Sequence, residues 1–493
     1  MLALNVIKRV VKALVYGLIG GFTVLLIAAV LYLNSRPDLK VWHQADLDAE
    51  FTEDSPVHSF AEYLALEERL FAQLEERVYA QIQPADKHNL SRYSSGSWSD
   101  PARWPTNWNH SFELTADSPR AGVLLLHGMS DSPYSLRSLG QRLQASGASV
   151  LGLRIPGHGT APVGLTGVSW EDMAAAVQLA MQHLHDTLGD KPVYIVGYSN
   201  GAALAVHYAL SALKDPGLPP VSGLVLFSPA IGVSPAAAFA VWQSRLGHLL
   251  GLQKLEWNAL LPEYDPYKYG SFAVNAGDLV YRLTTEIQAH FDTLSETDLK
   301  RFPRVLAFQS AVDGTVSVKD LVRGLFERLP VGGHELVLFD INRVTDLEYI
   351  LAKDPGPQID VLLGDADLSF AVSVAANRDE MSRDIVIRHK AVGGVEVSTE
   401  TTEFSWPEEV YSLSHLAMPM PAQDPLYGGP EAGKSPGIRL GNLALRGERG
   451  VLRVSAADML RIRWNPFYPY LEKRTLDFMH LTPRNPDVGR VSP

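Results

Sequence analysis

The sequence predicts an α/β fold in which a mostly parallel central sheet carries helices on both faces. Three observations support this class. From about residue 110 onward, short runs of Val, Ile and Leu alternate with segments of helical periodicity. These runs are continuously apolar, as expected of parallel strands that are buried on both faces. The 493 residues are 46% hydrophobic and 20% charged, which supplies the apolar material for a large core.

The composition excludes several classes of protein. The chain has no cysteine, so it has no disulfide, no cysteine-ligated metal or iron–sulfur cluster, and no cysteine nucleophile. Its formal net charge of −12 argues against a partner made of nucleic acid. This charge is unevenly distributed, because the first 35 residues carry +3 and the remaining 458 carry −15.

The amino-terminal segment has the length and polarity of a membrane anchor. Residues 13–33 are uncharged and, as a helix, span about 30 Å, the thickness of the hydrocarbon core of a bilayer. Lys8, Arg9 and Lys12 precede them, which favours an amino terminus in the cytoplasm. We therefore expect residues 1–35 to form a single-pass anchor that places the remaining chain across the membrane, in the periplasm if the source is bacterial. A cleaved signal peptide is the alternative.

Residues 36–109 are expected to connect this anchor to the main domain. The first of them, 36–58, have no clear period and are interpreted as a polar linker. From residue 59 to residue 83, apolar side chains recur at helical spacing, which predicts an amphipathic helix packed on the main domain. Acidic residues, Glu67 among them, are expected mainly on its other face.

The main domain, residues 110–493, begins with alternating strands and helices. The expected strands are 122–128, 149–155, 192–199, 223–229, 304–310 and 334–340. The expected helices are 133–145, 169–189 with Ser169 and Asp172 as a capping pair, and a third that ends near residue 213.

Two long segments interrupt this alternation. Residues 230–300 favour helix and contain aromatic residues that we expect to be exposed, including Trp257, Tyr267 and Tyr269. Residues 341–411 contain the strand-like runs VLLGD, FAVSV, DIVIRHKAV and VEVST. Each segment is too long for a plain loop, so each is expected to be a structured insertion.

The central chemical motif is Gly197-Tyr198-Ser199-Asn200-Gly201. It follows an apolar strand and opens an Ala-rich helix, which is the context of a strained strand–turn–helix that exposes a nucleophilic serine. Small residues are needed on both sides because the backbone turns tightly there. The motif predicts that Ser199 is the nucleophile of a hydrolase.

A serine nucleophile needs a base and an orienting acid, which in this architecture follow it in the order acid, then histidine. Asp313 comes directly after the strand 304–310 and is the expected acid, with Asp340 as the alternative. His415, in the loop SLSHLAMPMP, is the expected base. The other histidines beyond Asp313 are less suited, because they begin a strand, lie within one or follow the last helix: His334, His389 and His480.

The oxyanion formed during acyl transfer needs two backbone N–H donors. Asn200, directly after the nucleophile, is expected to supply one. Met129, in the loop after the first buried strand, is expected to supply the other. His127 is expected to brace this loop, and His158 in the PGHG turn to be structural or to line the pocket.

These residues together resemble the α/β-hydrolase-fold serine hydrolases, above all the branch of monoacylglycerol lipases, lysophospholipases and carboxylesterases. The resemblance covers residues 110–480 and rests on His127-Gly128-Met129, PGHG at 156–159, GYSNG at 197–201, and Asp313 and His415. It implies a Ser199–Asp313–His415 triad, an oxyanion hole at Met129 and Asn200, and a lid over about 230–300. The segment 341–411 is an insertion relative to that branch.

The expected function is a membrane-anchored serine hydrolase that cleaves carboxylic esters, with an acyl or lipid-like substrate, through an acyl-enzyme. No cofactor or metal is expected, since the sequence has no H-E-x-x-H motif and no glycine-rich phosphate loop. The alternatives are a peptidase, amidase or thioesterase on the same fold, an acyltransferase, and an inactive binding domain.

Overall fold

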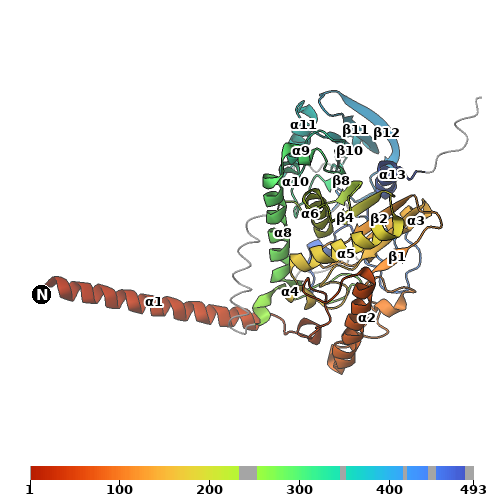
Figure 1. Cartoon of the computed structure of the whole chain (residues 1–493). Helices are drawn as coiled ribbons and strands as arrows, with labels where there is room; N and C mark the ends of the chain where they lie inside the picture. The colour runs from red at the N-terminus through yellow and green to blue at the C-terminus, as the bar shows by residue number, and fades with distance from the viewer. Residues whose placement is uncertain (1, 233–252, 345–350, 415–418, 442–450, 483–493) are drawn as a thin grey trace, which may run out of the picture.

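The centre of the structure is a ten-stranded sheet with the strand order β1-β3-β2-β4-β5-β8-β9-β10-β11-β12. The computed structural model describes residues 2–232, 253–344, 351–414, 419–441 and 451–482. Figure 1 shows the sheet in the middle of the body with helices packed around it. The strands from β3 to β10 run parallel to their neighbours, whereas β1, β11 and β12 are antiparallel. The predicted α/β class with a mostly parallel sheet is confirmed.

Every strand expected between residues 122 and 340 is present. The strands of the large sheet are β1 (Phe112–Leu114), β2 (Ala121–Leu126), β3 (Ala148–Leu153), β4 (Val193–Tyr198), β5 (Gly223–Phe227), β8 (Arg304–Ser310), β9 (Glu335–Phe339), β10 (Ala371–Asp379), β11 (Ser382–Lys390) and β12 (Val397–Ser405). A separate two-stranded sheet pairs β6 (Trp257–Ala259) with β7 (Phe272–Ala273).

Successive side chains of a strand point to opposite faces of the sheet, so the sheet separates two apolar cores. Leu124 and Leu126 of β2 face one core, and Val123 and Leu125 face the other. The first core is covered by α2 (Phe60–Arg77), α5 (Trp170–Leu188), α6 (Asn200–Lys214), α8 (Val274–Thr293), α10 (Val318–Gly324) and α11 (Gly356–Gly364). The second core is covered by α3 (Tyr134–Ala145) and α13 (Tyr468–Phe478).

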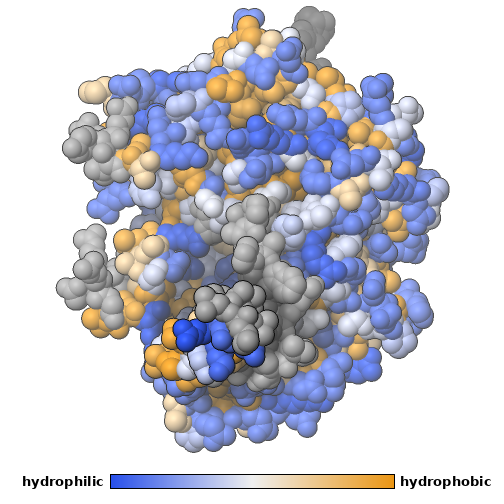
Figure 2. All heavy atoms as spheres, turned by 90° about the vertical axis from the view of Figure 1, so that its left-hand side faces the viewer, coloured by the Kyte–Doolittle hydropathy of each residue, from blue (hydrophilic) through white to orange (hydrophobic). Residues whose placement is uncertain are grey.

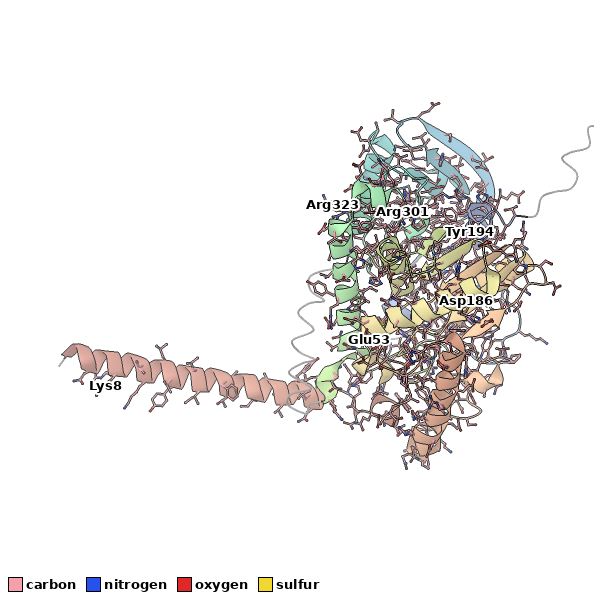
Figure 3. The ribbon with its side chains drawn as sticks, viewed as in Figure 1. Lys8, Glu53, Asp186, Tyr194, Arg301 and Arg323 are labelled. Atoms are coloured by element: carbon pink, nitrogen blue, oxygen red, sulfur yellow. The ribbon has the colours of Figure 1, made fainter. Side chains whose placement is uncertain are left out.

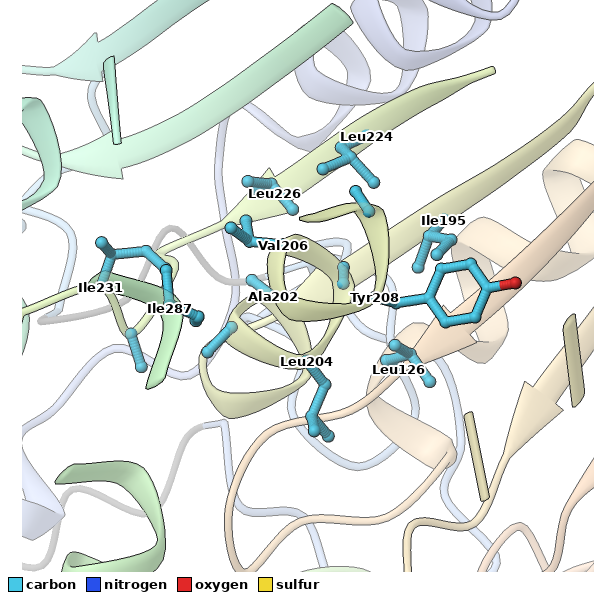
Figure 4. Packing of buried hydrophobic residues seen from close by; sticks show 14 of the residues in the cluster. Leu126, Ile195, Ala202, Leu204, Val206, Tyr208, Leu224, Leu226, Ile231 and Ile287 are labelled. Atoms are coloured by element: carbon cyan, nitrogen blue, oxygen red, sulfur yellow. The ribbon is translucent and has the colours of Figure 1, made fainter. Parts of the chain in front are cut away.

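The first core encloses α6. Every residue of this helix from Asn200 to Leu210 is buried, and its side chains pack against those of β2, β4, β5 and α8 (Figure 4). Because Ser199 directly precedes α6, this packing fixes the position of the predicted nucleophile.

The segment 341–411 extends the main sheet. β10 pairs in parallel with β9, and β11 and β12 then follow as antiparallel neighbours. The runs FAVSV, DIVIRHKAV and VEVST are therefore strands as expected. The run VLLGD is not a strand, because it lies in α11, whose residues Ile359, Leu362 and Leu363 pack on the first core.

The amphipathic helix expected over 59–83 is present as α2, with Ser59 as its amino-terminal cap, but it ends at Arg77 and a short 3-10 helix (Tyr79–Gln81) follows. The expectation that the acidic residues of α2 lie on the face away from the main domain is wrong for Glu67. This residue is buried against the fully buried Arg154. The Glu67 carboxylate accepts from Arg154 Nε at 3.0 Å and from the Ser111 hydroxyl at 2.8 Å. Glu50 binds the other end of the same guanidinium.

Residues 36–58 are not a free linker. Trp42 and Phe51 are buried in the body. Arg36 donates from Nη1 to the Trp257 carbonyl at 2.6 Å, and His43 Nε2 lies 3.0 Å from the Ser271 hydroxyl. These contacts join the segment after α1 to the chain around β6 and β7.

Within 230–300, the expected helical character is seen in α8 and in α9 (Glu296–Leu299). The expectation of exposed aromatics is wrong for Trp257, Tyr267 and Tyr269, which are all buried. Trp257 packs against His43, Tyr267 stacks on Tyr134, and the Arg92 guanidinium lies over the ring of Tyr269. The part of the expected lid at 233–252 lies outside the described residues.

The expected anchor, residues 13–33, lies in α1 (Leu2–Ser35), a continuous helix that projects from the body (Figure 1). Lys8 lies on its outer half, away from the body (Figure 3). The face of the body from which α1 projects shows mostly hydrophilic side chains with smaller apolar groups between them (Figure 2). No helix in the described ranges is long and apolar enough to cross a membrane. The prediction of a transmembrane anchor is therefore not supported, and the cellular location stays a prediction.

Candidate active site

Ser199 occupies a strained turn between β4 and α6. Its backbone has φ 53° and ψ −114°, a conformation that L residues rarely adopt. The Ser199 N–H donates to the Phe227 carbonyl at the end of β5, and the Ser199 carbonyl accepts from the Ala230 N–H at 3.1 Å. The residue is half-buried, so its side chain is accessible to solvent at the carboxyl edge of the sheet. This is the geometry that the strand–turn–helix motif predicts.

The glycines on either side of the nucleophile are required by close backbone approach. A Cβ atom at Gly201 would lie 2.2 Å from the Leu126 carbonyl oxygen, and one at Gly197 would lie 2.4 Å from Ala202 Cα. These separations are far below van der Waals contact. Gly197 and Gly201 therefore permit α6 to start directly above β2 and β4, as expected from the sequence.

Asp313 lies at the same edge of the sheet, in the turn that follows β8. Its Oδ1 accepts from the N–H groups of Thr315 and Val316, both at 2.8 Å, and its Oδ2 accepts from Gln309 Nε2 at 2.8 Å. Burial raises the pKa of Asp313 to about 7, although the bonds from Val316, Thr315 and Gln309 lower it. A buried carboxylate oriented in this way is suited to receive a cationic or polarised partner.

The alternative acid, Asp340, is engaged elsewhere. Both of its carboxylate oxygens accept from Arg343, at 2.7 and 3.0 Å. This bidentate pair accounts for Asp340 as a structural residue at the end of β9.

His415, the expected base, lies outside the described residues. The structure does show why the other histidines are less suited. His389 Nδ1 lies 2.9 Å from the Ser373 hydroxyl within β10 and β11, three strands beyond β8. His334 is buried next to the amino end of β9, the opposite edge from Ser199. His480 contacts Arg304, at the amino end of β8.

The loop after β2 approaches the nucleophile closely. A Cβ atom at Gly128 would lie 3.3 Å from Ser199 Cβ, so the next residue, Met129, is also close to the nucleophile. The Met129 N–H donates no hydrogen bond to any described residue. Asn200 is the first residue of α6, where N–H groups lack an intrahelical acceptor. Both N–H groups thus lie at this edge without an acceptor among the described residues, and their role as oxyanion donors stays a prediction.

His127 braces this loop, as expected. Its Nε2 accepts from the Ile155 N–H at 3.1 Å, so the ring is neutral with its proton on Nδ1, which donates to the Gly128 carbonyl at 2.9 Å. Burial holds the pKa of His127 well below its ordinary value. Burial likewise lowers the pKa of His158 to about 4, in agreement with the expected structural role of that histidine.

Two features of the site were not predicted from the sequence. Gln309, which contacts Asp313, is a polar residue directly after the apolar stretch VLAF of β8, and that position is the one signal that could have identified it. Arg461, from the carboxyl-terminal part of the chain, acts electrostatically on both Asp313 and Tyr198. No local pattern around Arg461 points to the nucleophile.

Among the described residues, no group of three or more His, Asp or Glu side chains is arranged to hold a metal ion. The described part of the site brings together the Ser199 hydroxyl, the buried Asp313 carboxylate and backbone N–H groups.

Comparison with known proteins finds hydrolases among the similar sequences. The sequence model of the family described as "Serine aminopeptidase, S33" matches residues 117–324, which include Ser199 and Asp313. The thermostable monoacylglycerol lipase of Bacillus sp. (strain H-257) is 27% identical over 123 residues, which make up 25% of this chain and 46% of the lipase. The chain therefore matches a little under half the length of this relative.

The solved structures that match part of this chain include lipolytic enzymes. The metagenome-derived lipolytic enzymes LipS and LipT give 21% identity over 48% of this chain and 88% of the matched chain, with a TM-score of 0.37. The monoacylglycerol lipase of Paleococcus ferrophilus gives 19% identity over 47% of this chain and 88% of that chain, with a TM-score of 0.35. From its own sheet order, its nucleophile turn and the family match, the chain has the α/β-hydrolase fold, and its residues 117–324 match the hydrolase family of the S33 serine aminopeptidases.

Proposed function

We propose that this protein is a serine hydrolase of carboxylic esters, with Ser199, Asp313 and His415 as its catalytic triad. The observation that carries the proposal is the strained turn at Ser199, which presents a hydroxyl at the edge where Asp313 also lies. Strain of this kind is maintained by the surrounding structure and is concentrated at functional sites. The family match over 117–324 supports the same class of enzyme.

In the proposed reaction, Ser199 Oγ attacks the acyl carbonyl carbon while His415 takes its proton. Asp313 orients the imidazole and stabilises its charged form. The N–H groups of Met129 and Asn200 donate to the oxyanion. His415 then protonates the leaving alcohol, and an acyl-enzyme remains. Water, deprotonated by His415, releases the acid and restores Ser199.

The substrate class follows from the chemistry of the relatives and stays a proposal for this chain. The matched region resembles a monoacylglycerol lipase, which suggests an acyl or lipid-like ester. A second candidate, removal of an amino-terminal residue from a peptide, is favoured by the description of the matched family. Both reactions use the same nucleophile and differ in the leaving group.

Labelling with a fluorophosphonate probe tests the mechanism. We expect the wild type to be labelled and Ser199→Ala to be unlabelled, with labelling of His415→Ala strongly reduced. Equal labelling of the wild type and Ser199→Ala would overturn the proposed nucleophile. Strong labelling of His415→Ala would instead reassign the base.

The substrate class is tested with two chromogenic series. One is p-nitrophenyl esters of increasing chain length, and the other is aminoacyl p-nitroanilides. Turnover of the esters alone supports the proposal, whereas turnover confined to the anilides would establish the aminopeptidase.

A further inference from the structure

The side chain of Gln309 makes a set of contacts centred on the predicted catalytic acid. Gln309 is the penultimate residue of β8 and is fully buried. Its Nε2 donates to Asp313 Oδ2 and to the Val316 carbonyl, both at 2.8 Å. Both amide hydrogens are therefore used within the turn that carries Asp313.

These two bonds determine the orientation of the carboxamide. If the amide were reversed, its oxygen would face two acceptors, the Asp313 carboxylate and the Val316 carbonyl. In the observed orientation, Gln309 Oε1 is buried and has no hydrogen-bond partner among the described residues. A buried acceptor without a partner is unfavourable, so an apolar side chain of the same shape would suit a purely structural position better.

The contacts also determine which part of Asp313 remains available. Oδ1 already accepts two backbone N–H bonds, whereas Oδ2 accepts from Gln309 alone among the described residues. A carboxylate oxygen has two lone pairs, so one acceptor direction on Oδ2 is left. In a serine triad, the acid holds the imidazole through such an acceptor direction.

We propose that Gln309 is a positioning residue of the catalytic triad, which holds Asp313 so that one acceptor direction of its Oδ2 is presented to the base. This inference rests on the proposed function, because it assigns a role to Gln309 only if Asp313 orients a catalytic histidine. Gln309 touches neither Ser199 nor the substrate in this role and acts through Asp313.

The surroundings of Asp313 determine the expected pH response. Among the described residues, the charge of Arg461 lowers the pKa of Asp313, and the charge of Asp313 in turn raises the pKa of Tyr198. The bond from Gln309 also lowers the pKa of Asp313. Loss of that bond therefore raises the affinity of the proposed pair of Asp313 and its histidine for a proton. As a result, the acid limb of the kcat/KM profile against pH moves to higher pH.

The test compares Gln309→Met with the matched control Gln288→Met, using steady-state hydrolysis of a p-nitrophenyl ester across pH and thermal unfolding of the full chain. Gln288, on α8, also donates a partly buried hydrogen bond, to the Gly324 carbonyl at 3.0 Å, and it is not one of the residues that donate to Asp313. For Gln309→Met we expect kcat to fall about ten- to a hundredfold, the range for a hydrogen bond to a charged group, with little change in KM. The acid limb of its kcat/KM profile should move upward, and Gln288→Met should keep the wild-type profile.

A second variant separates positioning from stability. Gln309→Glu keeps the shape of the side chain, but its carboxyl can donate a hydrogen bond to Asp313 only when it is protonated. The kcat of this variant should therefore approach that of the wild type toward acid pH and fall further below it as the pH rises. A folded Gln309→Met with wild-type kcat and pH profile, or an equal loss in Gln288→Met, would overturn the inference alone. A wild type that hydrolyses no ester would overturn the proposed function and this inference with it.

Discussion

The backbone strain at Ser199 predicts that replacing this proposed nucleophile by glycine stabilises the protein while abolishing the proposed activity. At φ 53° and ψ −114°, Ser199 lies in a region that is open mainly to glycine. A non-glycine residue in such a region costs on the order of 1–3 kcal/mol. Ser199→Gly removes this cost but loses about 0.5–1 kcal/mol because glycine is more flexible in the unfolded chain. The expected net gain is about 0.5–2 kcal/mol.

Ser199→Ala is the matched variant, because it removes the hydroxyl and retains the strain. Both variants should lose ester hydrolysis, and only Ser199→Gly should gain stability. The assay is urea-induced unfolding of the full chain, supported by thermal unfolding, where about 1 °C per kcal/mol is expected for a chain of this size. Ser211, inside α6 with helical backbone, is the control position, and there glycine should be about 1 kcal/mol less stable than alanine. If Ser199→Gly is no more stable than Ser199→Ala, the strain does not exist in solution.

Three further changes test the site and its surroundings. Because burial raises the pKa of Asp313 to about 7, its protonated form favours folding, and this contribution is lost as the pH rises from about 4 through 7. Asp313→Asn should therefore lose ester hydrolysis. It should unfold at a higher temperature than the wild type near pH 8 but not near pH 4. A higher unfolding temperature at acid pH alone would contradict the expected direction of the pKa effect. Glu67→Ala should destabilise the chain by about 3–5 kcal/mol in urea, because it leaves the buried Arg154 with one carboxylate fewer, and wild-type stability would refute that assignment. Gly201→Ala should abolish fluorophosphonate labelling, since its Cβ would lie 2.2 Å from a carbonyl oxygen of β2, whereas Gly277→Ala on α8 meets open space and should be labelled normally.

Much of the fold could be predicted because its signals are local. Continuous apolar runs identified the parallel strands from β2 to β9, and the capping pair Ser169 and Asp172 identified the start of α5. The nucleophile turn was equally local, because two glycines, a serine, a preceding strand and a following helix all lie within a short stretch of chain. Asp313 could be located because the carboxyl ends of parallel strands meet at one edge.

Other features could not be predicted, because they depend on which distant segments meet. Glu67 has the polarity of a solvent-facing residue, and only the approach of Arg154 makes its burial favourable. Trp257 and Tyr269 are buried, and residues far earlier in the chain, His43 and Arg92, lie against their rings. The run VLLGD is apolar enough for a strand or a helix, and its packing on the first core as α11 decides between them.

By itself, then, the sequence determined the class of the fold, the order of its strands along the chain and the nucleophile turn, since periodicity and turn chemistry act between near neighbours. The tertiary structure alone decided the extension of the sheet by β10 to β12, the burial of Glu67 and the contact of Gln309 with Asp313. The physical reason is that burial and hydrogen bonding of a polar side chain are settled by the groups that surround it in space, and a linear pattern does not specify those groups.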